Sequence, residues 1–365
     1  MMRSDQGYVM PVRSYAATQS TVSPYWWGGA ALLAAVAYPF TMLPVFSIAH
    51  MATSFWQVLL FSSASAIILL FPACGLFLLL GTAGQADRAA LIRRGMGIVL
   101  IVSPVLRVFS STVASLLHIP FTSLAVWFAL WTLIGALVLE RISHPEPLFS
   151  VRTMSKTKAV HRVSAIVIAF FVLAHLTVNL TILKSPEAYI SAASILRLAY
   201  RTPIAEPILI VLLAMQVVSG LIMASDAFCR RASSEYLIQV ACGLYFVVFI
   251  GSHTIAVAVL GRTLLNHGPD FTYASGGPGG LLASSGGVPL APYYLLAVVT
   301  FFLHLSRPLR LWMIKIGKAS LARPSVYGLV SLGSVVAIAL LIALCTPMIT
   351  QHVPHHFSNV PKRLR

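Results

Sequence analysis

His161-Arg162-Val163-Ser164 precedes an apolar stretch, Ala165-Ile-Val-Ile-Ala-Phe-Phe-Val-Leu-Ala174, which continues into His175-Leu-Thr-Val-Asn179. About 20 mainly apolar residues are enough to cross a bilayer as a helix, and this stretch has that length. It places one imidazole, that of His175, far beyond Arg162 and within the hydrocarbon. An ionisable side chain at that depth predicts a functional site.

The composition of the whole chain indicates a membrane protein. Of its 365 residues, 58% are hydrophobic and only 9% are charged, and the mean hydropathy is +0.87. A soluble domain carries roughly a quarter charged residues. The apolar runs lack the alternation of polar residues that barrel strands show. We therefore expect an all-α polytopic fold with about nine transmembrane helices, near residues 26–49, 55–81, 94–117, 121–139, 162–183, 204–225, 236–261, 293–314 and 326–349.

The net charge of +16 is distributed as the positive-inside rule expects. With the N-terminus inside, 17 of the 25 lysines and arginines fall on inner segments and seven on outer ones, while Arg107 falls within a span. This predicts an inside N-terminus and an outside C-terminus, in a bacterial cytoplasmic or mitochondrial inner membrane. Nucleic-acid binding is not expected, because no clustered basic face accompanies the charge.

The longest predicted inner connection divides four spans from five. We expect an N-terminal tail over 1–25, a four-helix membrane region of unknown role over 26–140 and an inner linker over 141–160. A five-helix bundle then follows over 161–350, and a C-terminal tail over 351–365.

Two histidines lie at matched depth in the C-terminal half. His175 precedes Lys184 by nine residues, and His253 precedes Arg262 by nine residues, on predicted helices of the same direction. A b-type haem between helices needs two such imidazoles. We predict that His175 and His253 are the axial ligands of one haem. The alternative is that each imidazole only forms hydrogen bonds within the bundle.

His304 lies only three residues before Arg307, in the other half of the membrane. At its depth the 204–225 helix carries Gln216, which is a poor haem ligand. A second bis-imidazole site is therefore not expected. His304 would instead hydrogen-bond Gln216, contact a quinone, or ligate alone.

Roughly residues 156–350 resemble the cytochrome b membrane-anchor subunit of succinate dehydrogenases and fumarate reductases, in its five-helix single-chain form. The similarity lies in His161-Arg-Val-Ser164, His175-Leu-Thr-Val-Asn179, Arg201-Thr-Pro with Glu206, Ser219-Gly220, His253 and Phe302-Leu-His304-Leu-Ser. In two-haem members, the outer haem ligands match His175 and His253, and the inner ones match Gln216 and His304. The departure at Gln216 favours one haem b over two. The first four predicted spans have no counterpart in the family pattern.

The resemblance implies electron transfer by a subunit without substrate chemistry of its own. A flavoprotein and an iron–sulfur subunit would dock on the basic inner face and exchange electrons between succinate or fumarate and a membrane quinone. Arg162 is the candidate contact for a haem propionate or quinone carbonyl, since a guanidinium offers a fixed fork of donors. Positive-inside anchoring is the alternative role of Arg162. His161 would bond a propionate or relay a proton to reduced quinone, and Ser164 is a third candidate contact.

Two other interpretations remain open. One is a b-type cytochrome that serves a different quinone-linked oxidoreductase. The other is a transporter-like or structural membrane protein whose histidines are packing residues. Transport has little in its favour, because all nine acidic residues lie outside the predicted spans or near their ends.

Overall fold

The structure, a computed structural model, describes residues 33, 37–40, 55–119, 124–146, 149–264, 271–275, 280–281, 287 and 289–346. In this part of the chain the regular elements are helices, without a strand. Seven of these helices are long and apolar enough to cross a membrane. The prediction of an all-α multi-pass membrane protein is confirmed. The count of nine stays a prediction, because most of 26–49 and both predicted tails lie outside the described residues.

The long helices follow the predicted spans with shifted ends. They are α2 (Phe55–Leu80), α3 (Arg88–Leu116), α4 (Ala125–Ser143), α5 (Val151–Leu180), α7 (Ala205–Cys229), α8 (Ser234–Thr254), α10 (Leu290–Lys315) and α11 (Ala319–Cys345). The 3₁₀ turn η1 (Thr181–Leu183) extends α5, and the π-helix η2 (Ile255–Leu264) extends α8. Two shorter helices, α6 (Pro186–Tyr200) and α9 (Phe271–Ala274), were not predicted.

The helix that carries His161 and His175 begins earlier than the apolar pattern predicts. Ser150 caps α5 by accepting a hydrogen bond from the Thr153 amide at 3.2 Å, which satisfies one of the free amides of the first turn. The cluster from His161 to Ser164 therefore lies inside the helix rather than at its start. The connection from α4 to α5 is only 144–150, so the predicted linker is partly helical.

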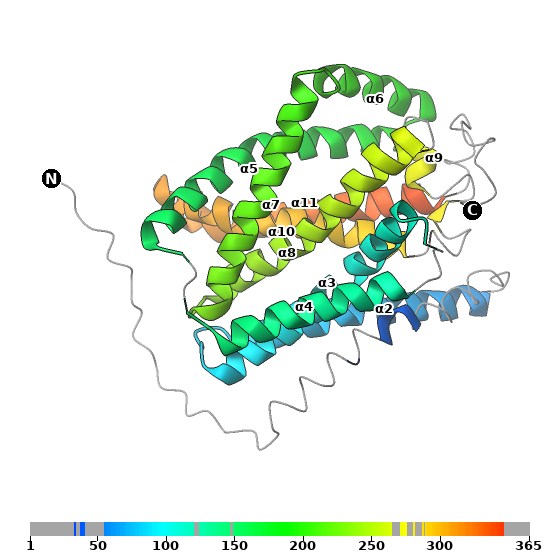
Figure 1. Ribbon diagram of the computed structural model, residues 1–365. Coiled ribbons are helices and arrows are strands. Elements are labelled where there is room, and N and C mark those ends of the chain that lie inside the picture. Colours follow the sequence, from blue (N-terminus) through cyan, green and yellow to red (C-terminus); the bar gives the residue numbers. More distant parts are fainter. Residues whose placement is uncertain are drawn as a thin grey trace.

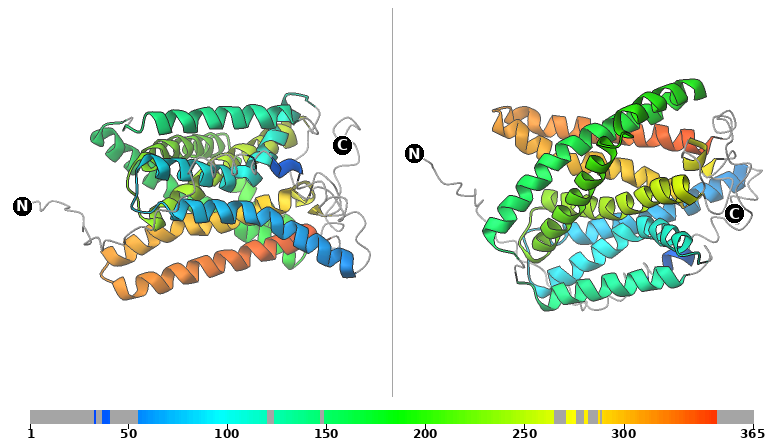
Figure 2. Two further views of the ribbon diagram at one scale, coloured as in Figure 1. Left: turned by 90° about the horizontal axis from the view of Figure 1, so that it is seen from below. Right: turned by 45° about the horizontal axis from the view of Figure 1, so that its top comes forward.

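Five helices form a ring in the C-terminal half (Figure 1). Packing contacts run from α5 to α7, from α7 to α8, from α8 to α10, from α10 to α11, and back from α11 to α5. Helix α3 packs on the outside of α8, and α2 and α4 flank α3, so these three helices lie together on one side of the ring (Figure 2). These five helices therefore form a ring that is closed by helices far apart in sequence. The division of the chain into domains stays a prediction.

Glycines permit the closest helix contacts. A Cβ on Gly75 of α2 would lie 2.5 Å from the Gly97 carbonyl oxygen of α3, so the two backbones touch. A Cβ on Gly333 of α11 would lie 2.4 Å from the Phe302 ring of α10. Small residues allow such approach where lipid supplies no hydrophobic drive between helices.

Arg94 joins the N-terminal helices to the ring. Its side chain is fully buried. The guanidinium donates to the carbonyls of Ala227 (3.3 Å), Phe228 (2.7 Å) and Arg230 (2.7 Å) at the end of α7. It also donates to the Thr82 and Gln85 carbonyls that follow α2, at 3.2 and 2.5 Å. One cation thus satisfies the free carbonyls of two helix ends, where the helix dipole also favours positive charge. We call this side of the bundle the Arg94 end, and the opposite side, where η2 lies, the Arg262 end.

Arg94→Leu should lower the free energy of unfolding by about 2–4 kcal/mol, because five carbonyls, three of them in buried contacts, lose a charged donor. Thermal unfolding of the purified protein in detergent measures the loss. Arg88→Ala, at an exposed position of the same helix, is the matched control and should change stability by less than about 0.5 kcal/mol. Equal losses in the two variants would contradict this role for Arg94.

Candidate functional site

A cavity of about 630 Å³ lies inside the five-helix ring. This volume falls within the roughly 300–1,000 Å³ of small-molecule and cofactor sites. Its wall is mainly apolar and aromatic, and four histidines from three helices line it: His161 and His175 of α5, His253 of α8 and His304 of α10. The structure therefore brings together all four histidines singled out in the sequence.

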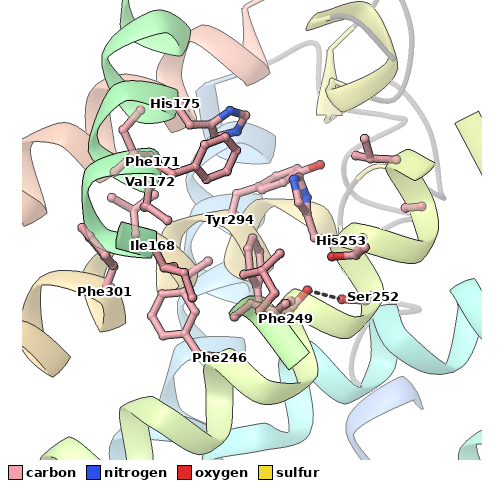
Figure 3. Close-up of a pocket in the computed structure, with 18 of the residues that line it drawn as sticks. Ile168, Phe171, Val172, His175, Phe246, Phe249, Ser252, His253, Tyr294 and Phe301 are labelled. Carbon is pink, nitrogen blue, oxygen red and sulfur yellow. Dashed lines mark hydrogen bonds between the residues drawn. The ribbon is translucent and has the colours of Figure 1, made fainter. Parts of the chain in front are cut away.

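His175 and His253 face the same space from α5 and α8, which do not pack closely on one another (Figure 3). Their ring centroids are 6.2 Å apart, with 72° between the ring planes. Apolar side chains surround the pair, among them Val172, Phe246 and Tyr294 (Figure 3). The two imidazoles that the sequence analysis paired are therefore neighbours in the fold.

The spacing of the two rings can be compared with simple metal geometry. With metal–nitrogen bonds of about 2.0 Å and about 1.15 Å from nitrogen to ring centre, two trans imidazoles have centroids about 6.3 Å apart, against about 5.1 Å at a tetrahedral angle. The observed value is close to the trans value, and it also lies within the roughly 4.5–7 Å range of ordinary edge-to-face ring pairs. No group of three or more histidine, cysteine or acidic side chains in the described chain is placed to hold a metal.

The two imidazoles are oriented by stacking. Phe171 lies beside the His175 ring at 6.0 Å and 18°, and Phe249 lies beside the His253 ring at 5.4 Å and 10°. A metal-binding histidine usually donates its other ring N–H to a carbonyl, carboxylate or water. Within the described residues neither ring has such a bond, so aromatic packing takes that orienting role.

A second polar cluster joins α5 to α7 nearer the Arg94 end. The amide nitrogen of Gln216 lies 3.0 Å from His161 Nε2, and Ser164 donates to Gln216 Oε1 at 2.6 Å. His161 Nδ1 lies 2.9 Å from Ser219 Oγ, whose own proton goes to the Met215 carbonyl. Nδ1 of His161 therefore donates to Ser219, and Nε2 accepts from Gln216.

Of the three roles left open for His304, the structure does not contain the hydrogen bond to Gln216. The ring centroid of His304 lies 6.3 Å from that of His161, with 65° between the planes. Nδ1 of His304 donates to the Gln239 carbonyl at 2.9 Å. A Cβ at Gly243 would lie 3.2 Å from His304 Cε1, so this glycine lets the ring rest against α8. The sequence analysis compared His304 only with Gln216 on the 204–225 helix, so it did not predict the contact with His161.

Arg162 does not line the cavity. It is exposed on the outside of α5, where its Nε donates to the Lys158 carbonyl at 3.4 Å. The predicted contact of Arg162 with a propionate or quinone inside the bundle therefore has no geometric basis, and the anchoring alternative fits its position. Ser164, by contrast, is buried and holds Gln216.

Cationic side chains that were not singled out as site residues line the cavity at the Arg262 end. Arg197 and Arg201 come from α6 and the residue after it, and Arg262 comes from η2. Arg262 forms an ion pair with Glu206 of α7. Among the described residues, the buried Nε atoms of Arg201 and Arg262 have no hydrogen-bond partner. Helix α6 was missed because, with 15 residues, it is too short to span a bilayer.

Comparisons of the chain with protein-family models, with curated proteins and with solved structures find no significant match.

The polar cluster predicts energetic coupling between α5 and α7. In a double-mutant cycle, Ser164→Ala and Gln216→Leu should couple by about 0.5–2 kcal/mol, because each loses the same hydrogen bond. Thermal unfolding of the two single variants and the double variant measures the coupling. Ser164→Ala combined with Ser334→Ala is the control, since the Ser334 hydroxyl bonds only its own helix. Additive effects of the Ser164 and Gln216 changes would refute the cluster.

Proposed function

We propose that the chain is a haem b-binding electron-transfer subunit, which anchors a succinate dehydrogenase- or fumarate reductase-like complex in the membrane. It would pass electrons between an iron–sulfur subunit and a membrane quinone. The observation that carries the proposal is the His175–His253 pair, with ring centroids 6.2 Å apart across a cavity inside the helix ring. The family resemblance of residues 156–350 supplies the partner subunits and the quinone.

The residues around the pair fit a haem. A bound haem would supply one-electron transfer, with a potential tuned by its axial ligands and its surroundings. His175 and His253 would hold the iron, and Phe171 and Phe249 would keep their imidazole planes in place. The wall from α5, α8 and α10 is mainly apolar, which suits a tetrapyrrole face.

Anionic groups of a haem would find their partners at the Arg262 end. Arg201 and Arg262 line the cavity there and hold buried Nε donors without partners. A guanidinium binds carboxylates through its fixed fork of donors. We therefore assign the propionate contact to this cluster instead of to Arg162. Glu206 offsets one of the arginine charges, so the mouth stays net positive.

The Arg94 end has the charge expected of a docking surface for soluble subunits. Exposed basic residues gather where α5 begins and where α10 turns into α11: Arg152, Lys156, Lys158, Arg162, Lys315, Lys318 and Arg323 (Figure 1). An acidic surface on an iron–sulfur subunit would complement them. The positive-inside rule places the same residues on the inner side, where the electrons would enter.

The haem assignment makes a spectroscopic prediction. Purified from a haem-sufficient host, the protein should show b-type bands in its reduced-minus-oxidised spectrum. His175→Ala and His253→Ala should each lower the haem content by one per chain, since either change removes an axial ligand. Because the ring planes are 72° apart, the oxidised haem should give the strongly anisotropic low-spin EPR signal of non-parallel imidazoles.

His144→Ala is the matched control, because this histidine is exposed beside Glu140, and it should keep the full haem content. A wild-type protein without b-type bands would refute the haem assignment. Stable isolation of the haem protein without flavin or iron–sulfur subunits, under conditions that preserve such complexes, would favour a b-type cytochrome of another quinone-linked oxidoreductase.

A further inference from the structure

Helix α6 has one buried side and one exposed apolar side at the Arg262 end. It packs on η1, α5 and α7, with Tyr189 and Ala193 buried (Figure 1). On the opposite side of the helix, Ile195 and Leu198 are 66% and 79% exposed. Ile204, between α6 and α7, is 73% exposed. A short helix with such an apolar side is typical of the boundary between lipid headgroups and acyl chains.

A hollow lies at the turn from α6 to α7, next to these apolar side chains. Arg197 lies in the last turn of α6, and Arg201 directly follows the helix. Two guanidinium groups therefore line the hollow, which is cationic and has an apolar edge. Its lining comes from one short stretch: Ser194, Arg197, Leu198, Arg201, Thr202 and Pro203.

This segment of the chain is net positive. Glu187 is the one acidic residue between positions 185 and 205. It precedes Arg197 by ten residues, which corresponds to about 15 Å along α6. The next acidic residue, Glu206, forms an ion pair with Arg262. Among the described residues, the buried Nε of Arg201 has no hydrogen-bond partner, so the hollow offers a donor for an anion.

A ligand for this place has to combine negative charge with apolar chains. A guanidinium binds phosphate oxygens through its fixed fork of donors. Free phosphate or an acidic protein surface would satisfy the arginines but leave the exposed isoleucines and leucine uncovered. A zwitterionic phospholipid brings its own cation close to the phosphate, and that cation is repelled by the arginine pair. An anionic phospholipid meets both requirements.

We propose that Arg197 and Arg201 bind the phosphate of an anionic phospholipid, such as phosphatidylglycerol, in the leaflet at the Arg262 end. The acyl chains would lie along Ile195, Leu198 and Ile204. Arg201 also lines the central cavity, and its five N–H donors are enough for one group on each side. This lipid site does not depend on the haem, so a protein that binds the lipid but no haem would overturn only the proposed function.

Lipid titration of the purified full-length protein tests the inference. Native mass spectrometry counts the lipids bound from detergent, with phosphatidylglycerol and phosphatidylcholine as the two probes. We expect tighter binding of phosphatidylglycerol. Its affinity should fall about fivefold in Arg197→Gln and again in Arg201→Gln, the usual effect of one arginine near an anionic leaflet. The matched control combines Arg88→Gln with Arg231→Gln, which removes two exposed cations at the Arg94 end and should keep the affinity.

Two measurements on the wild type do not depend on the folding of a variant. Amide hydrogen exchange over residues 194–203 should be slower in phosphatidylglycerol nanodiscs than in phosphatidylcholine nanodiscs. Inorganic phosphate in excess should not displace phosphatidylglycerol, because it lacks the acyl chains. Equal affinity for the two phospholipids, or an equal loss in the control variant, would overturn the inference. Displacement by inorganic phosphate would also overturn it and would identify a site for free anions.

Discussion

An imidazole that faces an apolar cavity inside a membrane bundle must find a partner for its ring nitrogens, because neither water nor lipid supplies one. Four histidines of this protein are under that constraint. Both ring nitrogens of His161 have partners, in Ser219 and Gln216, and Nδ1 of His304 donates to the Gln239 carbonyl. Within the described residues the rings of His175 and His253 have no such hydrogen bond, and they stack on Phe171 and Phe249. The haem iron that we propose would supply the missing partner of these two imidazoles.

The ring of helices keeps the two histidines of a pair apart. If α5 packed directly on α8, His175 and His253 would close the space between them; instead α7 lies on one side and α10 and α11 on the other. Arg94 adds a second restraint, because it binds the end of α7 to the α2–α3 connection. The N-terminal helices therefore have a physical role in the described part of the chain. They brace the ring from outside, along α8.

Most of the fold class was readable from the sequence, because long apolar runs have few alternatives to membrane helices. The matched depth of His175 and His253 was also readable, since both are counted from charged residues at a helix end. The contact between His161 and His304 was not predicted. The sequence analysis placed His161 at the inner end of its helix, whereas Ser150 starts the helix well before that position and the two rings lie 6.3 Å apart.

The arginines that line the cavity at the Arg262 end were not predicted as site residues from the sequence. Ser185, Pro186 and Glu187 are clear signals of a helix start, with Arg197 in the last turn. A search for bilayer-length segments passes over such a short helix. Which arginines reach the cavity depends on how α6 returns to α7, and composition carries no information on that path.

Experimental density for the purified protein tests the central claim most directly. A cryo-EM map, together with anomalous X-ray scattering at the iron edge where crystals are available, locates the metal without relying on spectra. The account predicts an iron peak with planar tetrapyrrole density between His175 and His253. Imidazoles that close on one another, or on water alone, in protein isolated from a haem-sufficient host would contradict it.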